Sequence, residues 1–309
     1  ALAAKDVRSS AAHWRPTRAY EERGLGTVLH HLLAPDTLAL KRFGEQAARV
    51  NAKLYAALFP DARPVVAYLE IARELLIGDL ARPDSVLHRA LFTPVLREGL
   101  LRRLAGVRGC WSPCVASGGE LPRTAGNGTA FFWGVDGRGR RHPLRLSPDN
   151  GAFEFPGFHL PLVPEAVIGA LRDRNIYPGL FVSYMTLALE HGLCCHGGIF
   201  LVRYLPTMLH AVRDLFMECG EPLPPLPGRT MLAAFAISMQ ARETGRLFPA
   251  GMLELLTSGG ISRADLQRLA DLPLEAVLPL SLARWCLDYT PRSQRTPAWE
   301  ADLRNVAWE

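Results

Sequence analysis

Apolar residues recur at helical spacing through most of the chain, outside a stretch in its middle. Over residues 64–77 the apolar positions share one helical face, and Gly78 is expected to end that helix. Ser262 begins another periodic segment, where its hydroxyl and the nearby Asp265 favour a helix through Leu269. Similar patterns predict helices over 27–33, 36–58 (with Asp36 as N-cap), 86–104, 164–173, 179–190, 206–219, 231–244, 249–256 and 274–289.

The middle of the chain changes to strand patterning. Two extended runs flank the sequence DGRG at residues 136–139, which is typical of a β-hairpin because glycine supplies the positive φ of a tight turn. A third short strand is expected at residues 152–155. Residues 106–128 are rich in turn-forming residues and show no periodicity. We therefore expect a small antiparallel sheet over residues 129–155, preceded by a long loop.

The order of these elements predicts an α+β fold that is predominantly α-helical, with a small antiparallel β-sheet inserted mid-chain. We divide the chain into an N-terminal helical layer (1–105), a glycine-rich loop with the small sheet (106–160) and a C-terminal helical region (161–309). A chain of 309 residues is long enough to bury a large core without disulfides. We expect one compact domain.

Composition excludes a disordered chain, because 49% of the residues are hydrophobic and 21% are charged. The 35 Lys and Arg residues include only Lys5, Lys41 and Lys53, so that 32 are arginines. The net charge of +5 is mild for this length and permits anionic partners without requiring them.

The cysteines and apolar segments predict a cytoplasmic protein. Six cysteines are spread along the chain without the spacing of a disulfide framework, which favours reduced thiols. The first 24 residues lack an apolar core of signal-peptide length. The longest apolar segment, residues 175–202, is interrupted by charge, proline and glycine, so we expect no membrane span.

The densest group of reactive side chains lies in the sequence EHGLCCHGG, residues 190–198. A thiol beside a histidine becomes a nucleophile when the imidazole takes its proton, and glycines let the backbone approach a substrate closely. The alternative is that the cysteines pack as small apolar residues and the glycines only turn the chain. The expected catalytic residues are Cys194, Cys195, His196, His191 and Glu190, with substrate contacts at Gly197 and Gly198.

A zinc site is an alternative use of the same segment. Two residues separate His191 from Cys194 and four separate it from His196, which are spacings that zinc ligands adopt. However, the adjacent thiols of Cys194 and Cys195 rarely bind one ion, and the Glu-x-x-His pair of a di-iron bundle is absent. We expect neither a metal nor another cofactor.

Two further segments are candidates for substrate binding. The small polar residues of the segment 111–133 can present backbone N–H groups to an anion, with Arg123, Thr124 and Asn127 as side-chain contacts. The phosphate-binding glycine motifs of nucleotide enzymes are absent.

The second of these segments is the basic hairpin at residues 138–145. Strand alternation predicts Arg141 and Arg145 on one face, where they can contact phosphate or RNA beside a stacking Trp133 or Phe132. The alternative is a solvated edge whose charges resist aggregation.

Taken together, these features favour a cytoplasmic enzyme of small-molecule metabolism, of the transferase class, acting on a small organic acid by acyl or group transfer. The basic hairpin favours an alternative, an RNA-binding protein or a tRNA-dependent transferase. A third hypothesis is a non-catalytic helical scaffold or partner subunit with Trp299 and Trp308 at its interface. The sequence does not determine the oligomeric state.

Overall fold

The chain folds into two compact units. Residues 1–68 and 235–309 form one, called the terminal unit, and residues 69–234 form the other, called the central unit. The boundaries between these units differ from the limits expected at residues 105 and 160. That the whole chain forms one compact domain stays a prediction. The computed structural model describes residues 19–61, 70–105, 107, 110, 129, 131–147, 149–197, 201–225, 231–233, 237–240, 247–271, 273 and 290–298.

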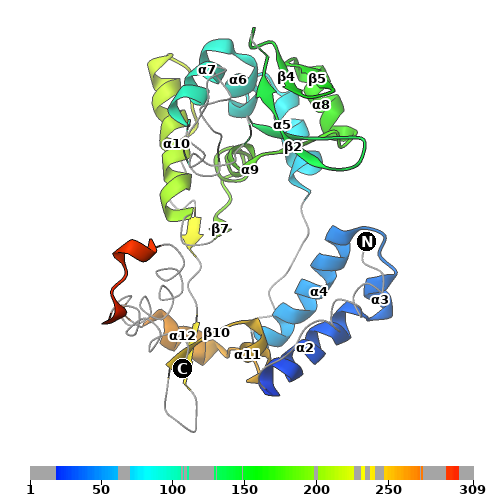
Figure 1. Cartoon of the computed structure of the whole chain (residues 1–309), viewed down its shortest axis with the longest axis vertical. Helices are drawn as coiled ribbons and strands as arrows, with labels where there is room; N and C mark the ends of the chain where they lie inside the picture. Colours follow the sequence, from blue (N-terminus) through cyan, green and yellow to red (C-terminus); the bar gives the residue numbers. More distant parts are fainter. Residues whose placement is uncertain are drawn as a thin grey trace. The chain divides into compact units, whose positions relative to one another are not determined.

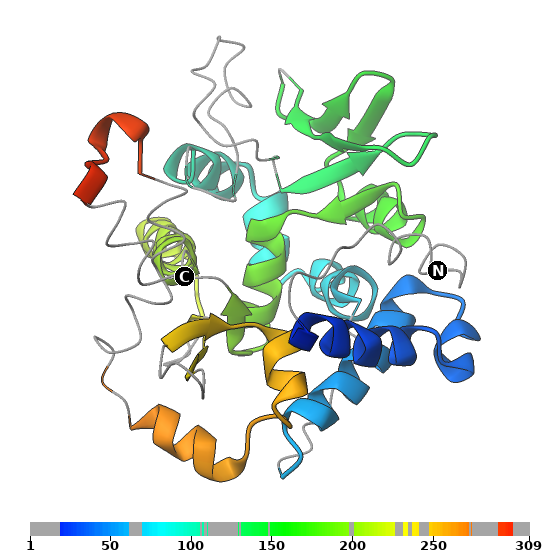
Figure 2. The same ribbon diagram turned by 60° about the horizontal axis from the view of Figure 1, so that its bottom comes forward.

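The terminal unit is built mainly from helices of both ends of the chain. Its helix α11 packs against α2 and α4 (Figure 2). Gly24 of α2 permits this packing, because a Cβ there would lie 2.9 Å from Cβ of Leu253. The elements are α2 (Ala19–Leu32), α3 (Pro35–Leu38), α4 (Phe43–Leu58), β9 (Ile237–Gln240), β10 (Leu247–Ala250), α11 (Met252–Thr257), α12 (Arg263–Ala270) and η4 (Arg292–Gln294).

Several expectations for the terminal unit need correction. The helix expected over 36–58 is two helices, α3 and α4, and Asp36 lies inside α3 with its carboxylate 2.8 Å from Nζ of Lys53 instead of capping. The helix expected over 249–256 begins only at Met252, because residues 247–250 pair with β9 as a strand. The expected cap at Ser262 is confirmed, since its hydroxyl accepts the N–H of Asp265. The helix expected at 274–289 lies outside the described residues.

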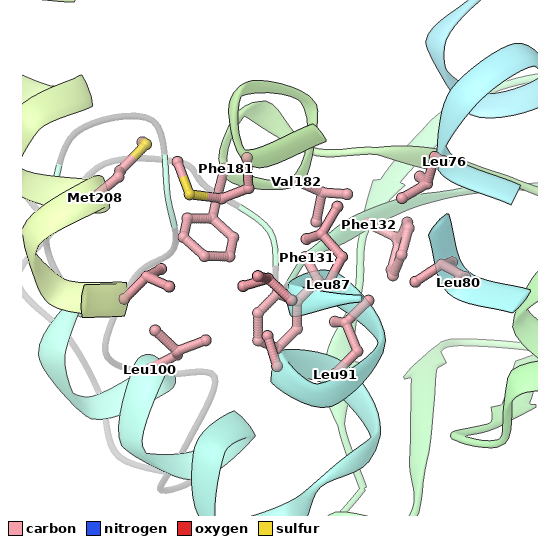
Figure 3. Packing of buried hydrophobic residues seen from close by; sticks show 14 of the residues in the cluster. Leu76, Leu80, Leu87, Leu91, Leu100, Phe131, Phe132, Phe181, Val182 and Met208 are labelled. Atoms are coloured by element: carbon pink, nitrogen blue, oxygen red, sulfur yellow. The ribbon is translucent and has the colours of Figure 1, made fainter. Parts of the chain in front are cut away.

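The central unit carries the larger described core. Helices α6 and α7 pack together, with α10 against α7 (Figure 1). The buried side chains, among them Leu87, Phe131 and Phe181, form one cluster (Figure 3). The helices are η1 (Ala72–Leu76, a π-helix), α5 (Ile77–Ala81), α6 (Val86–Phe92), α7 (Pro94–Arg103), α8 (Pro164–Arg172), α9 (Leu180–Tyr184), η3 (Met185–Glu190, a π-helix) and α10 (Leu201–Glu218).

The central unit also contains two antiparallel three-stranded sheets, in the orders β2-β1-β6 and β3-β4-β5, and the parallel pair β7-β8. The expected hairpin is β1 and β2, and the carboxylate of Asp136 accepts the N–H groups of Arg138 and Arg140 in its turn. The chain is therefore an α+β protein, predominantly helical, with strands mid-chain as predicted. The strands are β1 (Phe132–Val135), β2 (Arg141–Pro143), β3 (Arg145–Leu146), β4 (Ala152–Phe155), β5 (Phe158–Pro161), β6 (Ile176–Pro178), β7 (Cys195–Gly197) and β8 (Met231–Ala233).

Helix limits in the central unit also differ from expectation. Gly78 lies inside α5, and the helix expected over 86–104 is divided at Thr93, where Pro94 begins α7. α10 starts at Leu201 and includes Pro206, because burial of its apolar face outweighs the hydrogen bond that proline removes. The helix expected over 231–244 is wrong: β8 pairs in parallel with β7, and β9 pairs with β10, so sheet pairing overrides helix propensity.

Candidate functional site

Two buried carboxylates from distant parts of the chain meet in the central unit. Asp79 lies in α5, and Glu190 is the last residue of the π-helix η3. Their side chains are only 3% and 7% exposed. Ionisable groups are rarely buried to this extent without partners, so the groups around them define the candidate site.

His191 is held by one of these carboxylates. Its Nε2 lies 3.1 Å from Oδ2 of Asp79, and its side chain remains 31% exposed. Gly192 makes the turn that places His191 after the end of η3. Its φ of +62° lies in the left-handed region that glycine favours. An imidazole that is anchored on a buried carboxylate and partly exposed to solvent has the arrangement of an oriented proton acceptor.

Arg82 supplies the positive charge of the site. Its Nη2 lies 2.8 Å from Oδ1 of Asp79 and 3.9 Å from Oε2 of Glu190. The side chain is 56% exposed. Among the described residues, none makes a hydrogen bond to its Nε or Nη1. These donors are therefore available to an anionic group arriving from solvent.

Glu190 also connects η3 to the start of α6. Its Oε1 accepts the backbone N–H of Leu87 at 2.8 Å, in the first turn of α6, whose N-cap is Ser85. Burial raises the pKa of Glu190 above its ordinary value of 4.5, and the charge of Asp79 raises it further, against the lowering effects of the Leu87 N–H and Arg82. The site thus holds a carboxyl group that retains its proton more tightly than an exposed glutamate.

We expect the pH dependence of stability to change when Glu190 is replaced by glutamine. Because its folded pKa is raised, the native side chain stabilises the fold fully below pH 4.5 and loses that contribution as the pH rises through the folded pKa. Glutamine keeps an acceptor for Leu87 and does not titrate. Urea unfolding across this range should show wild type losing stability relative to E190Q as the pH rises, and parallel curves would contradict the assignment.

The thiol and imidazole expected to react together lie on opposite sides of a strand. Cys195 and His196 are neighbours in β7, where successive side chains point to opposite faces. Cys195 is 5% exposed and His196 is exposed. Burial, and then the neighbouring Cys194, raise the pKa of the Cys195 thiol. The structure therefore does not pair Cys195 with His196 as an activated nucleophile.

The other expected residues of this segment are dispersed. Cys194 is exposed, and Gly197 lies in β7, where a Cβ would meet Leu201 at 3.0 Å. The Cys195 thiol lies near Tyr184, whose pKa burial raises and whose hydroxyl is 3.4 Å from that of Tyr204. Four expected substrate contacts lie outside the described residues: Gly198, Arg123, Thr124 and Asn127.

The basic hairpin is divided between the two sheets. Arg141 lies in β2 and its guanidinium carbon is 4.9 Å from the centre of the Trp133 ring. Arg145 lies in β3, opposite Glu154, so the two arginines lie on strands of different sheets, and their sharing one face stays a prediction. Between the two strands, Leu144 is fully buried, and its N–H donates to the Thr129 hydroxyl at 2.7 Å. Phe132 is also buried and cannot stack on a ligand.

No family model, curated protein or solved structure matches the chain. Within the described part of the chain, no group of three or more histidine, cysteine, aspartate or glutamate side chains is arranged to hold a metal ion. No helix there is long and apolar enough to cross a membrane.

Sequence reasoning named Glu190 and His191 but missed Asp79 and Arg82. Asp79 lies 112 residues before His191 in the chain. The local sequence GDLARPDS carries an acid and a base three residues apart, a spacing that also suits an ordinary surface pair on a helix. The only signal in the sequence was the position of the two residues, a few residues before Ser85, the N-cap of α6.

Proposed function

We propose that the central unit is an enzyme that transfers an acyl or related group to or from a small organic acid, with His191 as its general base. The single observation that carries this proposal is the contact between Nε2 of His191 and the buried carboxylate of Asp79 at 3.1 Å. A carboxylate in that position fixes the ring orientation and stabilises the positive charge that the ring acquires when it takes a proton.

In this proposal the second ring nitrogen faces the reactants. With Nε2 donating to Asp79, Nδ1 of His191 takes the proton of an attacking hydroxyl, amine or water. The nucleophile bonds to the acyl carbon, the bond to the leaving group breaks, and the ring returns its proton to that group. Each proton taken is thus given back, and the step requires no oxidant or metal.

Arg82 supports an acidic substrate as the reactant class. Its guanidinium and the imidazole of His191 contact the two oxygens of the same carboxylate, that of Asp79, and a guanidinium binds a substrate carboxylate by charge-assisted hydrogen bonds. Burial raises the pKa of Glu190, which favours its neutral form, and this form does not repel an incoming anion.

The test is turnover on a panel of small acyl thioesters and acyl esters, each offered with and without a free carboxylate. We expect turnover of members that carry the carboxylate, and R82Q should raise their KM by about 10- to 100-fold, the effect of one charged hydrogen bond. The KM of neutral members should change little.

The matched control is R102Q, which removes another exposed arginine of the same unit, paired with Glu98 on α7. It should leave both groups of substrates unaffected. Turnover of no panel member, or an equal change for neutral and carboxylate-bearing members in R82Q, would contradict the proposed substrate class.

A further inference from the structure

One face of the sheet β2-β1-β6 carries aromatic and arginine side chains toward solvent. On the other face, Phe132 and Ile176 are fully buried in the core. Trp133 stands directly opposite Tyr177 on β6 and Pro143 on β2, and Val135 stands opposite Arg141. Since partners in register point to the same side, these five residues share one surface, called the outer face: Trp133, Val135, Arg141, Pro143 and Tyr177.

The outer face combines an exposed aromatic pair with positive charge. Tyr177 is 40% exposed, and Trp133 is half-buried under the guanidinium of Arg141 at 4.9 Å. Arg138 and Arg140 are exposed in the adjoining turn. The acid of this hairpin, Asp136, turns its carboxylate to backbone N–H groups and to Nε2 of His142 at 2.9 Å. The hairpin therefore carries three arginines and a single carboxylate, and that carboxylate is hydrogen-bonded within the hairpin. Its net charge is positive.

A solvated edge alone does not explain this arrangement. Charges that prevent aggregation belong on the edge strand, and here they do lie on β2 and its turn. The aromatic pair, however, lies on the central strand β1 and on β6, next to Arg141, whose guanidinium lies over the Trp133 ring. Cross-strand neighbours are about 5 Å apart, which suits two successive unstacked bases.

We propose that the outer face binds single-stranded nucleic acid, with bases stacking on Trp133 and Tyr177 and phosphates held by Arg138, Arg140 and Arg141. Stacking is tolerant of sequence because every base has a ring face, and arginine contributes both charge and planar contact. This site is independent of the carboxylate site around Asp79 and does not rest on the enzymatic proposal.

The test is fluorescence anisotropy with a labelled uridine oligomer of about 12 nucleotides, within the range that one stacking surface covers, and with the matching thymidine oligomer. We expect binding at low salt, weakened about 5- to 150-fold by W133A or by Y177A. Replacing the three arginines with glutamine should lower the slope of log affinity against log salt by about 2, or about 0.7 per phosphate contact.

Two matched variants serve as controls. Y55A removes a tyrosine of the terminal unit that is also 40% exposed, and R102Q removes an exposed arginine of α7. Neither should change binding. Tighter binding to the uridine oligomer than to the thymidine oligomer would assign RNA as the natural strand, and the reverse would assign DNA.

Four results would overturn the proposal. They are the absence of binding at low salt, equal losses in the control and outer-face variants, binding that W133A and Y177A leave unchanged, and binding to anionic lipid vesicles in preference to either oligomer.

Discussion

Replacing His191 by glutamine is expected to lower kcat by about 1,000- to 10,000-fold on any panel substrate that the wild-type protein turns over. General-base catalysis by one positioned side chain contributes about 100- to 10,000-fold, and the upper part of that range applies because a buried carboxylate orients this ring. The loss corresponds to about 4 to 5.5 kcal/mol of transition-state stabilisation. Glutamine retains an amide donor for Asp79, so the local fold should remain.

The matched control for this prediction is H159Q. His159 also contacts a carboxylate, Glu154 at 2.8 Å, but both partners are largely exposed on the strands β4 and β5. Its removal should leave kcat unchanged. If H191Q and H159Q have the same activity, His191 is not the general base, and its contact with Asp79 serves only to join η3 to α5.

The second large effect concerns stability. Phe132 is fully buried in the same cluster as Leu76 and Leu80 (Figure 3), and its ring meets that of Phe153 edge to face at 5.7 Å. Truncating such a side chain removes its burial and leaves a cavity, so F132A should cost about 3 to 5 kcal/mol in the free energy of unfolding. Urea unfolding measures this difference directly.

The adjacent residue is the matched control. Trp133 points to the opposite side of β1, where it is half-buried and contacts Arg141. W133A should cost about 1 to 2 kcal/mol, for partial burial and one cation–π contact. Equal losses in F132A and W133A would mean that the strand does not alternate between core and solvent as described. The same comparison establishes that W133A remains folded for the binding experiment.

Features set by local chemistry could be predicted from the sequence. The hairpin with its turn at 136–139 depends on glycines and on Asp136, all within a few residues of each other. The sequence predicted it, and the structure contains it as β1 and β2. The cap at Ser262 is equally local. The predominantly helical α+β class followed from the order of such segments.

Features set by pairing over long distances could not be predicted. Cys195 and His196 were expected to cooperate, but they alternate across β7, and β7 exists because it pairs with β8. The sequence of β8 predicts a helix. Because the pairing of β8 with β7 was not predicted, the separation of Cys195 from His196 was not predicted either. Asp79 likewise gave no sign of its role beyond its position before Ser85, because its partner His191 lies 112 residues away.

The central claim is that Asp79 orients His191 as a base, and the ring tautomer tests it most directly. At a pH where the ring is neutral, 15N NMR of His191 should show the proton on Nε2 in the wild-type protein, leaving Nδ1 as the acceptor. In D79N the oxygen of the new side-chain amide can accept a hydrogen bond from Arg82, and its N–H group can donate one to Nε2 of His191. Nε2 then carries no proton, so the ring proton moves to Nδ1. A proton on Nδ1 in the wild-type protein, or the same tautomer in both proteins, would contradict the account.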